Sequence, residues 1–253
     1  TGNYAPVKDE TTAFDLTVTG SIPSELDGRY FKNGANPPSG KSPHWFLGQG
    51  MIHGVEISNG KALWYRNRYV RTPIMAEENP SIMEMANPAN SLANTHVIGH
   101  AGKIFALEEG HHPIEMSQDV STIGPYDFGG KLKSSMTAHP KACSDTGELL
   151  FFGYGVFPPY LTYYRASASG ELLQIEDIPV KGSTMVHDFN ITQNYVIFMD
   201  LPMVFDVSKM MEGGLQVNFD SDYGARLGVM PRTGSAKDLR WFDVDPCYVF
   251  HAM

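Results

Sequence analysis

Three histidines, each beside an apolar run, are the residues of this chain best suited to hold a metal together. His139 lies in the stretch 136–141, His187 in 185–189 and His251 in 246–251, so they are 48 and 64 residues apart. A four-stranded propeller blade takes roughly 40–50 residues, so this spacing fits one histidine per blade. If each came from the strand nearest the central axis, the imidazoles would meet there and form a transition-metal site.

The other histidines have simpler interpretations. His44 and His53 stand in a glycine-rich stretch, where a metal site is one alternative. We favour a hairpin whose histidines form local hydrogen bonds. His111 and His112 are adjacent, and neighbouring strand residues point to opposite faces. We therefore expect both to be turn residues that do not share a metal.

Composition limits the class of protein. The 253 residues are enough for one large domain, which we expect to span 1–253, and the net charge of −9 argues against a nucleic-acid partner. Only Cys143 and Cys247 occur, which fits a reducing compartment better than a disulfide framework. No apolar run approaches the ~20 residues of a membrane span, and no signal peptide is visible at the start. These features predict a cytoplasmic protein.

Short strands separated by turns predict an all-β fold. The stretch 55–65 predicts a hairpin with Asn59-Gly60 as its two-residue turn, and 33–34 resembles a second such turn. The Met- and Asn-rich stretch 74–94 is expected to be irregular or a short helical excursion, and not a core strand. The histidine spacing favours a propeller over a sandwich. The predicted strands are 14–19, 28–34, 95–98, 103–108, 149–154, 161–166, 195–200, 225–232, 239–244 and 248–251.

Five stretches together resemble the carotenoid cleavage oxygenase family: 31–37, 44–54, 137–141, 186–192 and 241–251. They occur in the family's order, and the match runs from about Asn3 to the end of the chain. The resemblance implies a seven-bladed β-propeller with a helical cap. It also implies an Fe(II) ion held by four axial histidines, and cleavage of a carbon–carbon double bond with O₂ to give two carbonyl products.

The resemblance assigns roles to residues of this chain. His139, His187 and His251 match the first three iron ligands, while the fourth has no counterpart here. Glu109 matches a glutamate that orients a ligand histidine by accepting a hydrogen bond from the second ring N–H of that histidine. Asp188 is a competitor for that role, but it should face away from its neighbour His187. We expect an incomplete propeller of about four blades, truncated at its C-terminal end and leaving an unpaired strand there.

The resemblance also suggests a substrate. The stilbene-cleaving branch carries a lysine just before the second-shell glutamate, where this chain has Glu108, so a carotenoid or apocarotenoid polyene is favoured. A stilbene- or phenylpropanoid-cleaving dioxygenase is the alternative enzyme, and a non-catalytic propeller that binds a partner is the alternative of another class; the family's retinoid isomerase branch is disfavoured. Since polyenes live in bilayers, the stretch 74–88, with Met83 and Met85, is the expected site of peripheral membrane contact.

Overall fold

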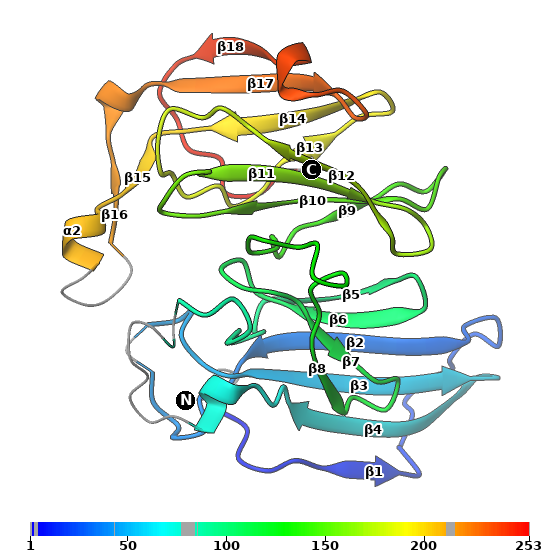
Figure 1. Ribbon diagram of the computed structural model, residues 1–253. Helices are drawn as coiled ribbons and strands as arrows, with labels where there is room; N and C mark the ends of the chain where they lie inside the picture. Colours follow the sequence, from blue (N-terminus) through cyan, green and yellow to red (C-terminus); the bar gives the residue numbers. More distant parts are fainter. Residues whose placement is uncertain are drawn as a thin grey trace. The chain divides into compact units, whose positions relative to one another are not determined.

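The computed structural model describes Gly2, residues 5–42, 44–76, Glu84, 86–210 and 216–252. It divides into two compact units, Thr1–Gly129 and Gly130–Met253. The described residues are almost entirely β: they form four four-stranded sheets and one two-stranded sheet, every pairing antiparallel (Figure 1). The expected all-β class is confirmed, while the closed ring of a propeller stays a prediction. No helix in the described part of the chain is long and apolar enough to cross a membrane.

The first sheet of unit 1 has the order β1-β4-β3-β2. Its strands are β1 (Thr12–Phe14), β2 (Gly28–Ala35), β3 (Gly50–Ser58) and β4 (Lys61–Tyr69). The β3–β4 hairpin closes at Asn59 and Gly60, whose φ angles of 49° and 73° are those that a type I′ turn requires, so this prediction is confirmed. The buried Asn67 holds the N-terminal segment on β4: its side chain accepts from the Thr11 amide (2.7 Å) and donates to the Asp9 carbonyl (2.8 Å).

The second sheet of unit 1 runs in chain order, β5-β6-β7-β8. Its strands are β5 (His96–His100), β6 (Lys103–Leu107), β7 (Ile114–Met116) and β8 (Thr122–Pro125). Apolar side chains of both sheets and of the loops beside them form one buried cluster. Its fully or almost fully buried members are Ile52, Val70, Ala93, Ala106, Ile114, Met116 and Val120.

Unit 2 also contains two four-stranded sheets, ordered β12-β11-β10-β9 and β13-β14-β17-β18. The first consists of β9 (Lys141–Ala142), β10 (Leu149–Tyr154), β11 (Leu161–Ala166) and β12 (Leu172–Asp177), and the second of β13 (Asn190–Ile191), β14 (Tyr195–Asp200), β17 (Ala225–Pro231) and β18 (Arg240–Val244). A hairpin of β15 (Met203–Phe205) and β16 (Val217–Phe219), with the one-turn helix α2 (Val207–Met210), projects from one end (Figure 1). Short 3-10 turns are η3 (Ser221–Tyr223) and η4 (Ala236–Asp238) in unit 2 and η2 (Pro73–Ala76) in unit 1.

The two sheets of unit 2 share a buried aromatic and aliphatic core. Phe152 of β10 meets Phe189 edge-on at 5.2 Å between ring centroids, and Tyr163 of β11 meets Phe198 of β14 at 5.6 Å. All four rings are fully buried. Since edge-to-face pairs add to simple area burial, this core fixes the sheets that carry the histidine segments described below.

Three local predictions were wrong. The strand expected over 14–19 does not form: β1 shares only Phe14 with it and ends there, because Asp15 has a left-handed φ of 56°. The turn expected at 33–34 lies inside β2. The strand expected over 248–251 does not form: β18 ends at Val244, Pro246 without an amide N–H follows it, and the chain from there to Ala252 is irregular. Within the stretch expected to be irregular, residues 77–83 and 85, with Met83 and Met85, lie outside the described part.

Candidate metal centre

His139 stands at the entrance to the edge strand β9. The Thr137 amide donates to the Phe152 carbonyl of β10 (2.7 Å), and the His139 amide donates to the Thr137 hydroxyl (3.1 Å). Pro140 follows at once, so the chain cannot continue this ladder before β9 begins. His139 therefore lies in a short loop that is anchored at Thr137 and ends where β9 begins.

His187 lies three residues before β13, the edge strand of the other sheet. Its segment is anchored by the Met185 amide, which donates to the Met203 carbonyl (2.8 Å), and by the burial of Val186 and Phe189 in the core. His187 itself is 7% exposed. The ring of Phe250 stacks on its imidazole, with centroids 3.8 Å apart and planes 30° apart. Phe250 thus shields one face of His187 from water.

His251 comes from the irregular segment after β18. The Tyr248 hydroxyl donates to the Met185 carbonyl (3.2 Å), which fastens this segment to the one that carries His187. Tyr248 and Ala252 also pack on the small buried cluster of Met199, Leu201 and Ala225. His251 is exposed, so the centre is closed on the side of His187 and open on the side of His251.

The three imidazoles converge through the same ring atom. Nε2 of His187 lies 3.0 Å from Nε2 of His139 and 3.1 Å from Nε2 of His251. A ring nitrogen carries either one proton or one lone pair, so Nε2 of His187 cannot donate to one neighbour and accept from the other. A cation placed among the three nitrogens satisfies all three lone pairs. The donor set therefore fits a bound metal better than it fits a hydrogen-bond chain.

The spacing of the nitrogens also bears on ion binding. Two of the three Nε2–Nε2 distances are 3.0 and 3.1 Å, and the ligand atoms of all three histidines lie within 4.8 Å of one another, so His139, His187 and His251 could hold one cation together. Neutral imidazoles suit iron, copper, nickel and zinc.

Asp188, next to His187, is 2% exposed at its side chain. Burial raises the pKa of this carboxyl, but the bonds from the Lys141 ammonium and from the Ala252 and Phe189 amides outweigh it and hold the pKa below its usual range. Asp188 is thus a buried carboxylate stabilised in its charged form. The strand-face argument from the sequence does not apply to it, because residues 185–189 are not in a strand.

Glu109 follows β6 in unit 1, and its contact with a ligand histidine stays a prediction. The turn that presents Glu109 is held by the preceding residue. Oε1 of Glu108 accepts from the Gly110 amide (2.7 Å), while its Oε2 contacts His111 Nδ1 (2.6 Å) and the Ser91 hydroxyl (3.2 Å). Burial raises the pKa of Glu108, but these hydrogen bonds and the charge of His111 outweigh burial and hold the pKa below its usual value.

The remaining histidines behave as local residues. His53 lies on β3 and its Nδ1 is 2.8 Å from the Tyr65 hydroxyl, while burial lowers its pKa. His44 Nδ1 accepts from the Phe46 amide (3.1 Å). His111 sits in the turn with Glu108, as expected. Across the residues that the structure describes, His139, His187 and His251 are the one group of three or more histidine, cysteine or acidic side chains arranged to hold a metal.

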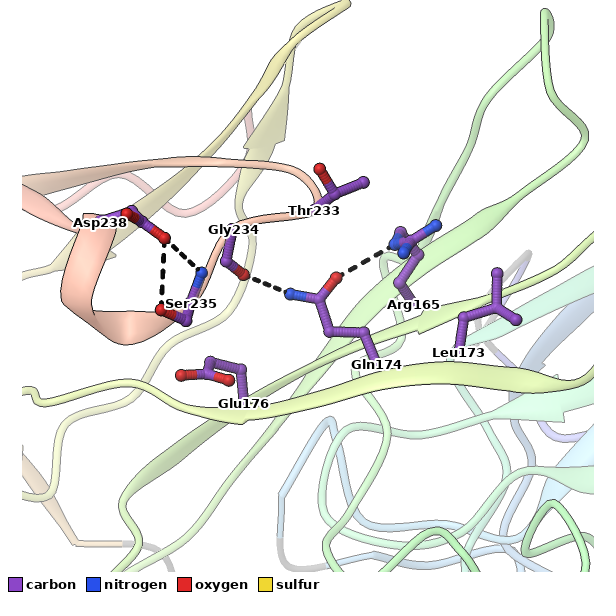
Figure 2. A pocket seen from close by; sticks show the side chains of 8 residues that line it. All are labelled: Arg165, Leu173, Gln174, Glu176, Thr233, Gly234, Ser235 and Asp238. Carbon is purple, nitrogen blue, oxygen red and sulfur yellow. Dashed lines mark hydrogen bonds between the residues drawn. The ribbon is translucent and has the colours of Figure 1, made fainter.

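A polar hollow of about 380 Å³ lies elsewhere on unit 2 and joins the two sheets (Figure 2). Gln174 of β12 spans it: its amide oxygen accepts from Arg165 Nε (3.1 Å) and its amide nitrogen donates to the Gly234 carbonyl (2.6 Å). None of the three histidines lines it. Gln174 therefore links β12 to the loop after β17, and we interpret the hollow as a structural feature that is separate from the metal centre.

Comparison with known proteins agrees with this geometry. A profile of the retinal pigment epithelial membrane protein (RPE65) family matches residues 4–253. The carotenoid cleavage oxygenase of Mycobacterium tuberculosis (strain ATCC 25618 / H37Rv) is 38% identical over 301 residues, covering 100% of this chain and 60% of the relative. The carotenoid 9,10(9',10')-cleavage dioxygenase of Crocus sativus is 38% identical over 290 residues, covering 99% and 53%.

Among solved structures, the lignostilbene dioxygenase of Pseudomonas brassicacearum is similar, with a TM-score of 0.84 and 34% identity over 95% of this chain and 54% of that one. The chain therefore spans between 53% and 60% of the length of these relatives. The matched family profile covers nearly every residue, including all three histidines and Glu109. The chain belongs to the RPE65/carotenoid cleavage oxygenase family.

Proposed function

We propose that the complete protein is a non-haem Fe(II) dioxygenase that cleaves a carbon–carbon double bond of a carotenoid or apocarotenoid with O₂, giving two carbonyl products. The observation that carries this proposal is the convergence of three Nε2 atoms with spacings of 3.0 and 3.1 Å. The names of the curated relatives supply the reaction class. Iron supplies the ability to activate O₂ when it is bound.

The residues of this chain have distinct tasks in the proposal. His139, His187 and His251 present neutral imidazoles, which leave the charge of the ion undiminished, and a fourth histidine of the family has no counterpart among them. Phe250 covers one face of His187 and keeps water from it. Glu109 accepts a hydrogen bond from the second ring N–H of a ligand histidine, which fixes the tautomer and orientation of that imidazole.

The sheets are proposed to be blades of a seven-bladed propeller. The edge strands β9 and β13 are the first strands of their sheets in sequence, and His139 and His187 lie two and three residues before them. This is the arrangement expected if the innermost strand of each blade carries one axial histidine. The similarity in fold to the lignostilbene dioxygenase supports the same architecture.

A polyene is the proposed substrate, with a stilbene as the second candidate because the lignostilbene dioxygenase is 34% identical. The residue before Glu109 favours the polyene. Glu108 replaces the lysine of the stilbene-cleaving branch, and its carboxylate is already bound by Gly110, Ser91 and His111. It therefore cannot bind a phenol as an ammonium group could.

Iron content and product analysis of the full-length protein test this proposal. We expect about one iron per chain, lost in His187→Ala, and carbonyl products from a carotenoid or apocarotenoid presented in detergent micelles. Conversion of a hydroxystilbene alone would move the substrate to the second candidate. A full-length protein that binds no iron and cleaves neither compound would refute the enzyme and favour a non-catalytic binding module.

Peripheral membrane contact through the stretch 74–88 is also proposed, because a polyene must be taken from a bilayer. Flotation with liposomes should decrease in a Met83→Ser, Met85→Ser variant. Equal flotation of the variant and the wild type would dismiss the contact.

A further inference from the structure

One buried carboxylate is bonded to all three segments that carry the converging histidines. Oδ1 of Asp188 accepts from the Lys141 ammonium (2.8 Å), two residues after His139. Oδ2 of Asp188 accepts from the Ala252 amide (2.8 Å), one residue after His251. Asp188 itself is the residue after His187. Three segments that are far apart in sequence thus meet at a single side chain.

The segments need such a tie because their own secondary structure is slight. β9 and β13 are two residues long and each is an edge strand, and the segment of His251 has no strand after β18. Three imidazole lone pairs that face one another at about 3 Å repel when no cation lies between them. The backbone must therefore be held by bonds made outside the imidazoles.

The carboxylate is fitted to this task by its two oxygens. Oδ1 also accepts from the Phe189 amide (2.8 Å), so it fixes its own segment as well as Lys141. Lys141 in turn lies over the ring of Phe189, 5.9 Å from its centroid. Charge-assisted bonds of this kind are shorter and stronger than neutral ones. Removing the charge would release two segments at once.

We propose that Asp188 is a positioning residue that sets the three histidines at metal-binding distance before the metal arrives. This inference rests on the proposed metal centre. Asp188 contacts neither the metal nor the substrate in this proposal. It acts on the histidines through its bonds to Lys141 and to the Ala252 amide. Preorganised ligands bind more tightly because less ordering accompanies binding.

Metal affinity measured in the full-length protein tests the inference without any turnover. Co(II) is the probe, because its visible absorption reports the ligand geometry and its dissociation constant can be measured by competition with a chelator. Asp188→Asn is the main variant: an amide has one acceptor oxygen, so either the Lys141 side or the Ala252 side must face an NH₂ group. We expect the dissociation constant to rise about tenfold or more, with an altered Co(II) spectrum.

A second variant and a second measurement make the test robust to loss of stability. Lys141→Met removes only the partly exposed ammonium and should raise the dissociation constant about threefold, which is less than Asp188→Asn. Hydrogen exchange of the Ala252 amide in the metal-free protein should quicken in Asp188→Asn and not in Lys141→Met. This measurement reads the tie directly, in the absence of the ion.

The matched control is Asp200→Asn in the same unit. Asp200 is fully buried and is bonded to Arg226 (2.7 Å) and the Tyr223 hydroxyl (2.6 Å), neither of which belongs to a segment that carries one of the three histidines. It should lower the melting temperature at least as much as Asp188→Asn while the Co(II) affinity stays within about twofold of the wild type.

The outcomes separate the two proposals. Wild-type affinity and spectrum in Asp188→Asn would overturn the positioning role, as would an equal loss of affinity in Asp200→Asn, since the effect would then be general destabilisation. A wild-type protein that binds neither Co(II) nor Fe(II) would overturn the metal centre itself, and the positioning role with it.

Discussion

Removal of the Glu108 carboxylate should loosen the turn that presents Glu109. The change is Glu108→Ala, which deletes the acceptor for the Gly110 amide, the Ser91 hydroxyl and His111 Nδ1. Without this carboxylate, the Gly110 amide can form its hydrogen bond only with water. The turn joins β6 to β7, so the expected effect is local opening of this connection.

The magnitude follows from the bonds. Bonds to a charged group contribute about 1.5–3 kcal/mol each, and loss of one member of a buried ion pair destabilises by about 3–5 kcal/mol. The Glu108 and His111 side chains are 16% and 18% exposed, so water compensates in part and the lower bound, about 3 kcal/mol, applies. One factor of ten corresponds to about 1.4 kcal/mol, so exchange of the Gly110 amide should quicken about 100-fold.

The assay is amide hydrogen exchange of the full-length protein, read at Gly110. Glu108→Gln keeps one acceptor oxygen and should quicken exchange only about tenfold. Glu115→Ala is the control, because Glu115 forms a single 2.6 Å ion pair with the more exposed Lys103 and should contribute under about 1 kcal/mol. If the exchange rate of the Gly110 amide in Glu108→Ala stays within threefold of the wild-type rate, Glu108 does not hold this turn.

Three further predictions concern other parts of the molecule. The pKa of the Cys143 thiol is lowered to about 7 by hydrogen bonds from the Thr146 hydroxyl and Arg232, so its alkylation by iodoacetamide in a Cys247→Ser background should reach half its maximum rate near pH 7. Phe198→Ala should reduce the free energy of unfolding by about 3–5 kcal/mol, measured by urea denaturation, because the ring is fully buried. Gly50→Ala should reduce it by about 3 kcal/mol or more, because a Cβ would lie 2.0 Å from the Ala93 carbonyl oxygen.

Each of these has its own control. Thr146→Val should move the Cys143 profile to higher pH, and an unchanged profile would contradict the stated cause. Phe242→Ala removes a ring that is 54% exposed and should change stability by under about 0.5 kcal/mol. In Gly99→Ala the new Cβ would have nothing nearer than 3.9 Å, so destabilisation equal to that of Gly50→Ala would refute the steric argument.

Strands with a strong apolar pattern were predictable from the sequence. Leu149–Tyr154, Leu161–Ala166 and Tyr195–Asp200 were predicted residue for residue, because each is an apolar run between turn signals. β9 and β13 were missed because two residues carry no periodicity. β12 was missed because its apolar and polar residues do not alternate in step with burial: Leu173 and Ile175 are exposed, and the place of the strand depends on pairing with β11.

The histidine set was predictable for a different reason: spacing and motif identify His139, His187 and His251 without any knowledge of the loops around them. The contacts that hold these three histidines in place were not predictable. The bonds from Lys141 and Ala252 to Asp188 join residues that no local pattern relates, and they arise only when the loops are placed by the core. The stacking of Phe250 on His187 likewise depends on a segment that was expected to be a strand.

The order β1-β4-β3-β2 has a consequence for synthesis on the ribosome. β1 is made first of these strands but pairs only with β4, and the Thr11 amide and its Asn67 acceptor are 56 residues apart. At about 5–20 residues per second, β1 waits roughly 3–11 s for its partner to be translated. The β3–β4 hairpin can close before β1 docks, so β1 is added to a preformed edge. A nascent chain stalled before β4 emerges should therefore leave this N-terminal strand accessible to chaperones and proteases.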